Sequence, residues 1–277
     1  MTALLLTLLV SLTAPVSGSS GVDSVRITYV GNEGFLIESG GKKVLIDALY
    51  RAGVSGYVVH TPDVRKLLER ALPPFDNLDL ILATHFHADH FDPDAVGIHL
   101  LSDRNASFLT TNQAAGQMES YQGYRNIQAR VKGILPEEGQ EEVLDYGDMQ
   151  IHVFNLHHGR GRPVENLGFL IVIGDRTFLH VGDTEVSAAQ LASYGLQARD
   201  IDFFFVPYWF LLDNPDDVNM VSTVGPHTVI PMHLPPKDDP RGFMADTGGF
   251  EGTVARIASN YPNAVVFEEP MTTKTFP

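Results

Sequence analysis

Short apolar runs alternate with turn residues along the chain from Val25 onward, and this pattern predicts several strands. Gly-Asn-Glu-Gly and Ser-Gly-Gly segments, which favour turns, separate the first three runs. These predicted strands are VRITYVG at 25–31, GFLIES at 34–39 and KKVLIDAL at 42–49. Helices and strands then alternate, which indicates that a mixed sheet continues beyond the opening strands.

The next part of the chain predicts three helices and two strands. Residues 61–72 form the first predicted helix, with Thr61 as the N-cap and Pro62 at the first helical position. A buried strand at 78–85 follows and runs directly into a group of histidines. The remaining predicted elements of this part are a helix at 93–103, a strand at 106–111 and a helix at 113–121.

The second half of the chain repeats this order of strands followed by alternating helices and strands. Its predicted strands lie at 147–158, 167–174, 176–183, 201–207, 227–233 and 263–269. Its predicted helices lie at 187–195, 216–225 and 249–261. Two mixed sheets packed together with helices outside would bury the apolar faces, so we expect one α/β domain at 21–277.

The first 20 residues differ from the rest because they contain no charged side chain. An apolar run from Ala3 to Leu12, followed by small residues and Pro15, is typical of a secretory signal peptide. The signal peptide is predicted at residues 1–20, with cleavage near Val16-Ser17-Gly18. Its removal would leave a periplasmic or secreted protein without a membrane span. No Lys or Arg precedes the apolar run, so a wrongly assigned start codon, and with it a cytoplasmic protein, is the alternative.

The chain is acidic, with 34 Asp and Glu against 19 Lys and Arg and a net charge of −15. Because nucleic-acid binding requires a concentrated positive patch, this balance argues against a nucleic-acid partner. Cysteine is absent, which excludes disulfides, a thiolate nucleophile and sulfur ligands for a metal. The expected partner is a small-molecule substrate, and the sequence leaves the oligomeric state open.

The segment THFHADHF at 84–91 contains three of the 11 histidines of the chain and one aspartate. His85 and His87 lie two positions apart in an extended segment, so both imidazoles can face one cation. Asp89 and His90 follow after the chain has turned, and they can face a second point. A tetrahedral zinc ion takes about four ligands, so this cluster needs further residues to complete a site.

Three later segments place candidate ligands where a predicted strand ends and a loop begins, as α/β sheets commonly do. These candidates are His157 or His158, Asp183 and His233. Successive residues of a strand point to opposite faces, so only one of the two adjacent histidines can be a ligand. The other histidines are interpreted as structural or surface residues: His60, His99, His152, His180 and His227.

The order His-x-His-x-Asp-His, a later His, Gly-Asp-Thr and a final Pro-x-His resembles the metallo-β-lactamase superfamily. It is similar in particular to the metal-dependent hydrolases of that superfamily, which include lactonase-like and phospholipase-D-like members. The resemblance extends over residues 24–270, and the opening YVGNEGFLIESGGKKVLIDAL places Asp47 at the family's structural aspartate. It implies a four-layer αββα sandwich, the metallo-β-lactamase fold, with the site at one edge of the two sheets.

The resemblance also implies ligands for two divalent metal ions, with zinc expected and manganese or iron as alternatives. The implied ligands of one ion are His85, His87 and His158, the last chosen over His157 because glycine follows it, as it often follows the family ligand. Those of the other ion are Asp89, His90 and His233. Asp183 would bridge the two ions.

A dinuclear site of this kind predicts hydrolysis of an ester, lactone, amide or phosphodiester bond, because two ions lower the pKa of water and polarise the substrate. His85, His87 and Asp89 are the predicted catalytic residues, and Asp89 is expected to orient the hydroxide and move its proton. Weaker candidates for substrate binding are Arg160, Arg162, Tyr208 and Trp209, and the segment 50–74 is a candidate flap. An iron-dependent redox protein of this fold and a non-catalytic metal-binding protein are the alternatives.

Overall fold

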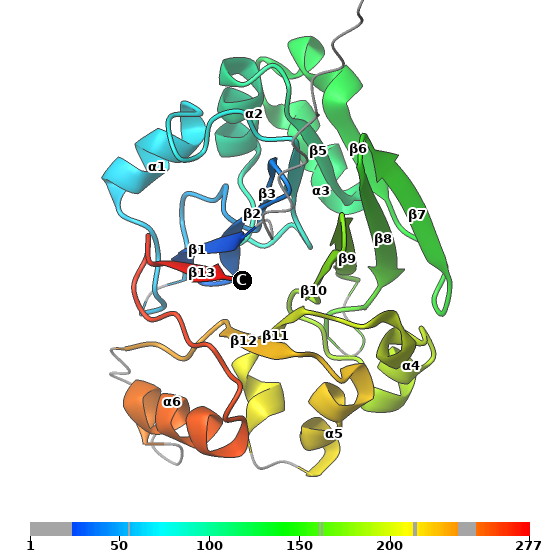
Figure 1. The fold of residues 1–277 in the computed structure, drawn as a ribbon. Coiled ribbons are helices and arrows are strands. Elements are labelled where there is room, and N and C mark those ends of the chain that lie inside the picture. Colours follow the sequence, from blue (N-terminus) through cyan, green and yellow to red (C-terminus); the bar gives the residue numbers. More distant parts are fainter. Residues whose placement is uncertain (1–23, 55, 160, 162, 213–214, 238–247) are drawn as a thin grey trace, which may run out of the picture.

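The computed structural model describes residues 24–277 except for residues 55, 160, 162, 213–214 and 238–247. The expected signal peptide at 1–20 therefore lies outside the described residues, and export of the protein stays a prediction. Within the described part of the chain, no helix is long and apolar enough to cross a membrane. The described residues form two sheets with helices on their outer sides (Figure 1).

The first sheet has seven strands in the order β13-β1-β2-β3-β4-β5-β6. Its strands are β1 (Val25–Gly31), β2 (Gly34–Ser39), β3 (Lys42–Ile46), β4 (Leu80–Leu82), β5 (Ser107–Thr111), β6 (Val131–Ile134) and β13 (Thr273–Phe276). β1, β2 and β3 pair antiparallel through short turns, and β4, β5 and β6 then add in parallel. This order confirms the predicted change from hairpins to alternating helices and strands.

The second sheet has six strands in the order β12-β11-β10-β9-β8-β7. Its strands are β7 (Glu141–Tyr146), β8 (Met149–Asn155), β9 (Leu167–Ile173), β10 (Arg176–His180), β11 (Phe203–Pro207) and β12 (Thr228–Met232). Strands β7 to β10 pair antiparallel, and β11 and β12 add in parallel to β10. As a result, β8, β10 and β12 run in the same direction.

Each sheet has its own layer of helices (Figure 1). The first sheet carries α1 (Pro62–Glu69), α2 (Pro93–Ser102) and α3 (Asn112–Gln117), and the second carries α4 (Ala188–Ala192), α5 (Pro215–Val224) and α6 (Gly249–Asn260). Short 3-10 helices are η1 (Met118–Ser120), η2 (Tyr124–Asn126), η3 (Gln128–Arg130), η4 (Leu196–Arg199) and η5 (Tyr208–Leu211). The predicted cap of α1 is confirmed, since the Val64 amide donates to the Thr61 hydroxyl at 3.3 Å. The four layers confirm the αββα architecture.

Two clusters of buried apolar side chains hold the layers together. One lies between the sheets and under the helices of the second layer, where the ring of Phe35 lies 4.8 Å from that of Phe205. The other joins the outer face of the first sheet to α1, α2 and α3, where Phe91 stacks on Phe108 at 5.7 Å. Burying each such ring stabilises the fold by roughly 1.5–3 kcal/mol. The two clusters therefore stabilise the sheets from which the loops at the sheet edge extend.

The predicted strand at 263–269 is wrong. Ala264 forms a single bridge to Val229, and the last strand of the chain is β13. Phe267 is buried in the core. The apolar residues of this segment therefore pack into the core, although the backbone does not pair continuously with a neighbouring strand. The pattern also does not predict β6 and β7, because β6 has only four residues and β7 is mostly exposed, so neither shows a clear alternation.

Candidate metal centre

The candidate ligands lie at one edge of the two sheets, in the loops that follow four strands. His85 follows β4, His158 follows β8, Asp183 follows β10 and His233 directly follows β12. Because β8, β10 and β12 run in the same direction, their carboxyl ends meet at the same edge of the second sheet. The topology therefore brings together residues that are up to 148 positions apart in the chain (His85 to His233).

Asp47 fixes the start of the histidine segment. Its two carboxylate oxygens accept hydrogen bonds from the Thr84 amide and the Thr84 hydroxyl, both at 2.7 Å. The chain then turns, with the amides of His90 and Phe91 each donating to the His87 carbonyl at 3.0 Å. An extended stretch followed by a turn was the expected conformation, and it lets the segment present ligands to two different points.

Four residues form a first donor set: His85, His87, His158 and Asp183. Each contributes one nitrogen or oxygen atom, and these atoms lie within 4.8 Å of one another. Asp183 Oδ2 lies 3.8 Å from both His85 Nε2 and His158 Nε2, and His85 Nε2 lies 2.9 Å from His87 Nδ1. Among the described residues, His157 belongs to no such group, so the structure brings His158 and not its neighbour to the site.

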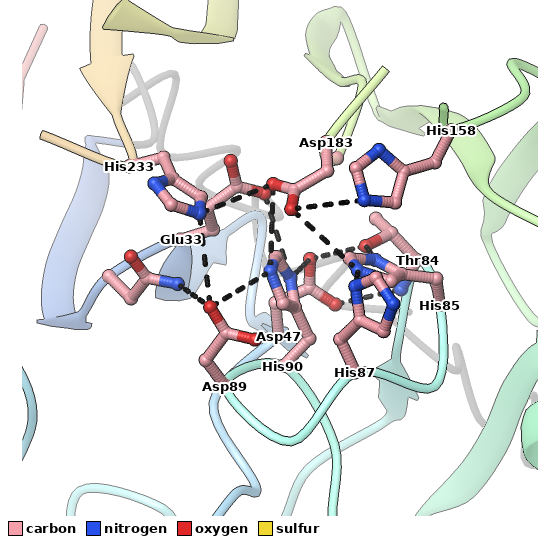
Figure 2. Close-up of polar contacts among 12 residues, drawn as sticks. Glu33, Asp47, Thr84, His85, His87, Asp89, His90, His158, Asp183 and His233 are labelled. Atoms are coloured by element: carbon pink, nitrogen blue, oxygen red, sulfur yellow. Dashed lines mark hydrogen bonds and ion pairs between the residues drawn. The ribbon is translucent and has the colours of Figure 1, made fainter. Parts of the chain in front are cut away.

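Three further residues form a second donor set: Asp89, His90 and His233. Asp89 Oδ2 lies 3.8 Å from both His90 Nε2 and His233 Nε2. The other oxygen of Asp183, Oδ1, lies 3.6 Å from His90 Nε2 and 3.7 Å from His233 Nε2. Asp183 thus directs one oxygen at each donor set, as Figure 2 shows.

Both donor sets suit divalent cations. Among the described residues, His90 Nε2 and Asp183 Oδ1 are buried without a hydrogen-bond partner, which costs about 1–3 kcal/mol for each group unless a cation binds there. Their separation of 3.6 Å is close to the roughly 3.3–3.4 Å expected between ligands placed about 2.0–2.1 Å from a tetrahedral ion. Imidazole and carboxylate donors without sulfur suit zinc, manganese or iron.

Hydrogen bonds behind the donor atoms orient the ligands. His90 Nδ1 lies 3.0 Å from Asp47 Oδ2, and His85 Nδ1 lies 3.1 Å from Thr84 Oγ1, so both Nε2 atoms point into the site. Asn32 donates to Asp89 Oδ2 at 3.2 Å. Contacts of this kind fix the ring orientation and the tautomer of a ligand before a metal binds.

Burial and neighbouring charges set the protonation states of the donor sets. Burial, together with nearby histidines, holds the pKa of His85 well below its usual value and lowers the pKa of His87. Burial favours the protonated form of Asp183, but His233 and His90 outweigh it and hold the pKa of Asp183 well below its usual range. Burial opposes the charged form of His90, but nearby carboxylates outweigh it and hold its pKa well above the usual value. Neutral His85 and His87 and an ionised Asp183 are the forms that bind a metal.

Aromatic rings flank His233 on two sides. The centroid of the Trp209 ring lies 5.3 Å from that of His233, and the centroid of Tyr57 lies 4.7 Å from it, both edge to face. Tyr208 is the first residue of η5, and the centroid of its ring lies 5.5 Å from that of Trp209. Of the two predicted aromatic residues, Trp209 therefore lies beside a candidate ligand.

Arg160 and Arg162 lie outside the described residues, so their contact with a substrate stays a prediction. The segment proposed as a flap is only in part beside the site: its loop up to residue 60 carries Tyr57, whereas α1 packs on α2 in the outer layer. The remaining histidines belong to neither donor set in the described part of the chain: His60, His99, His152, His180 and His227.

The sequence pattern does not single out three residues that the structure places at the site: Asn32, Glu33 and Tyr57. The first two form the turn between β1 and β2, and such a turn is common between strands. The φ angle of Asn32 is 50°, and its amide donates to the Val58 carbonyl at 2.7 Å, so the turn is held against the loop that carries Tyr57. A glutamate between two apolar strands is the one signal that could have drawn attention to this turn.

Replacement of Gly182 by alanine is expected to destabilise the protein by about 2–5 kcal/mol, because it adds both a steric clash and backbone strain. The added Cβ would lie 2.4 Å from Asn166 Oδ1 and 2.7 Å from Thr84 Cβ, at a φ of +58°. Urea unfolding monitored by circular dichroism measures the change. Gly174→Ala is the matched control, since its φ is +62° but no atom lies within 4 Å of the added Cβ. Equal losses in both variants would contradict the steric explanation.

A family model described as Beta-lactamase superfamily domain matches residues 26–233. This range contains both donor sets and most of both sheets. The match therefore covers the part of the chain that builds the site.

Curated relatives with similar sequences are named UPF0173 metal-dependent hydrolases. One from Pelotomaculum thermopropionicum is 27% identical over 218 residues, which is 76% of this chain and 84% of the relative. Another from Symbiobacterium thermophilum is 26% identical over 248 residues, which is 86% of this chain and 99% of the relative. Both similarities extend over more than four fifths of the relative.

Solved structures share the fold at lower sequence identity. Igni18, a metallo hydrolase from Ignicoccus hospitalis, has a TM-score of 0.56 and 21% identity, with 92% of this chain and 99% of that chain covered. The metallo-β-lactamase fold protein YhfI from Bacillus subtilis has a TM-score of 0.59 and 15% identity, with 92% and 100% covered. These structures confirm the predicted fold.

Proposed function

Since the chain belongs to the β-lactamase superfamily and is a metal-dependent hydrolase, we propose that it binds two divalent metal ions at the two donor sets. Asp183 carries this proposal, because its two oxygens face separate sets at 3.6–3.8 Å. His85, His87 and His158 would hold one ion, and Asp89, His90 and His233 would hold the other. Zinc is the expected metal, with manganese and iron as alternatives.

The proposed reaction is hydrolysis of an ester, lactone, amide or phosphodiester bond in a small or lipid-like molecule. When bound, two metal ions would lower the pKa of a water molecule toward neutrality and polarise the bond under attack. Asp89 is buried, and the Asn32 amide donates to its Oδ2 atom, so its carboxylate is held in place within the second donor set. Asp89 would accept the proton of the attacking water and pass it to the leaving group.

The rings beside His233 support a substrate with an apolar part. Trp209 and Tyr57 are half-buried and form an aromatic border next to the second donor set. Aromatic side chains bind apolar groups through large contact areas at little entropic cost. The substituent next to the scissile bond would pack against these two rings.

Replacement of Trp209 by alanine is expected to raise KM for substrates with an apolar substituent about tenfold, with kcat changed far less, because binding contacts are lost. The metal content of the variant should equal that of the wild type. Steady-state kinetics with paired apolar and polar substrates measure the difference, and Trp209→Phe should keep most of the affinity. A fall in kcat without a rise in KM would contradict a role in binding. Trp209 is the only tryptophan of the chain, so its fluorescence also reports binding at this position.

The decisive experiment combines elemental analysis with a hydrolysis panel on protein purified without chelator. The panel contains a lactone, a bis-aryl phosphodiester, a chromogenic cephalosporin and an aryl ester. About two zinc or manganese ions per chain together with turnover of one panel member would support the proposal and identify the bond. Iron without turnover would contradict hydrolysis and favour the redox alternative; a structural neighbour, CmlA of Streptomyces venezuelae, is a diiron β-hydroxylase with a TM-score of 0.60 and 17% identity.

A further inference from the structure

Glu33 is a buried carboxylic acid with no assigned role at the metal centre. It lies in the turn between β1 and β2, and its side chain is 0% exposed. Neither of its carboxyl oxygens has a hydrogen-bond partner among the described residues. Figure 2 shows its carboxyl group directed toward Asp183 and the second donor set. A fully buried carboxyl group without hydrogen bonds is costly, so a partner for it should exist in the functional protein.

The surroundings of Glu33 supply histidine and carboxylate but no fixed positive charge. Its Oε2 atom lies 3.6 Å from His90 Nδ1, and one of its carboxyl oxygens lies within 4.8 Å of one donor atom each of His90 and Asp183. A second such group joins Glu33 to Asp47 and His180. In the described part of the chain, no lysine or arginine forms an ion pair with any carboxylate of this cluster. When His90 is neutral, as metal ligation requires, a bound cation is the positive charge that this arrangement lacks.

Of the two carboxylates beside His90 Nδ1, those of Glu33 and Asp47, only that of Glu33 lacks a hydrogen bond among the described residues. Both oxygens of Asp47 take part in hydrogen bonds with Thr84, and one of them also lies 3.0 Å from His90 Nδ1. His180 Nε2 lies 3.1 Å from the backbone carbonyl of Glu33, and not from its side chain. Asp47 therefore supports His90, whereas Glu33 remains free to bind at the centre itself.

The backbone holds Glu33 in place without help from its carboxyl group. The His233 amide lies 3.2 Å from the Asn32 carbonyl, so this turn is tied to a candidate ligand of the second ion. A Cβ at Gly34 would lie 2.9 Å from the Asp47 carbonyl, which shows how closely the turn packs against β3. A side chain positioned by its backbone in this way is suited to bind a metal with little reorganisation.

We propose that Glu33 supplies an additional oxygen ligand to the second ion, and that this ligand shifts the preference of that position toward manganese or iron and away from zinc. The inference rests on the proposed dinuclear centre. With Glu33, the second position would have three carboxylates, Glu33, Asp89 and Asp183, beside two imidazoles. Carboxylate-rich sites with more than four ligands favour manganese and iron(II), whereas four-coordinate sites rich in imidazole suit zinc.

The test measures metal selectivity rather than activity. Metal-free wild type, Glu33→Gln and the control Asp103→Asn are each equilibrated with an equimolar mixture of manganese chloride and zinc sulfate at two metal equivalents per chain. Asp103 is a matched control because it is also a buried carboxylate, but it binds the Leu78 amide at 2.8 Å, away from both donor sets. Elemental analysis gives the manganese-to-zinc ratio, and electron paramagnetic resonance reports manganese at the second position.

We expect the Glu33→Gln variant to lose manganese affinity at the second position about tenfold or more, with zinc affinity changed far less. The manganese-to-zinc ratio should fall in this variant and remain at the wild-type value in Asp103→Asn. A wild-type ratio in Glu33→Gln would overturn the proposal, because glutamine preserves the size and shape of the side chain but loses the anionic ligand. Circular dichroism melts establish that each variant is folded.

A measurement on the wild type keeps the proposal testable if Glu33→Gln does not fold. A crystal structure of the manganese-loaded protein should show a Glu33 oxygen within about 2.5 Å of the second ion, and a longer distance would overturn the proposal. Failure of the proposed function gives a different result. Two bound ions with a Glu33-dependent manganese-to-zinc ratio but no turnover would support this inference and contradict hydrolysis. Turnover with a ratio that does not depend on Glu33 would support hydrolysis and contradict this inference.

Discussion

Replacement of Asp183 by asparagine is expected to reduce metal binding from the proposed two ions to one or none and to lower kcat/KM about 10³-fold or more, equivalent to ~4 kcal/mol. One neutral amide cannot give an anionic oxygen to each of the two donor sets, although the wild-type carboxylate faces both. The variant would also remove the negative charge that lies 3.6 Å from His90 Nε2. Elemental analysis and steady-state kinetics with the panel substrate measure the two effects.

The matched control is Asp175→Asn, in the turn between β9 and β10. Its side chain is 95% exposed and its one ion pair, with Arg176, is a surface contact. This control should bind two ions and keep wild-type kinetics. If Asp183→Asn retained two ions and full activity, the interpretation that Asp183 gives one oxygen to each donor set would be wrong.

Removal of the metal ions by a chelator is expected to lower the melting temperature by about 5–10 °C. A ligand present at 100 times its dissociation constant stabilises the native state by about 2.7 kcal/mol, and each kcal/mol shifts the melting temperature of a domain of this size by about 2–4 °C. The physical cause is the loss of the cations that offset buried carboxylates and unpaired imidazole nitrogens. Scanning calorimetry with and without chelator measures the shift, and added zinc or manganese should reverse it.

The Asp183→Asn variant provides the control for this experiment. With fewer bound ions to remove, its melting temperature should change by less than half as much as that of the wild type. A chelator effect of equal size in both proteins would indicate that the stabilising ions bind elsewhere in the chain.

Some ligands of the candidate site lie close together in the sequence, whereas others meet only in the folded chain. His85, His87, Asp89 and His90 lie within six residues, so their spacing alone predicts that they face two points. The family resemblance favours His158 over His157, but strand periodicity alone does not choose between them. Adjacent residues at the end of a strand point in opposite directions, and only the tertiary structure shows that His158 points toward the other ligands. Glu33 is not predicted for a related reason, since a turn residue gives no sign of what packs around it.

The sequence by itself determined the order of elements in most of the chain, the ligand types and the expected fold, because apolar periodicity, turn residues and ligand spacing are local properties. The tertiary structure decided which distant residues meet. It brought His158, Asp183 and His233 to the histidine segment, because β8, β10 and β12 run in the same direction and end at one sheet edge. It also placed Glu33 and the aromatic rings beside His233, and it replaced the expected last strand at 263–269 with β13. These contacts depend on burial between layers, which no short stretch of sequence contains.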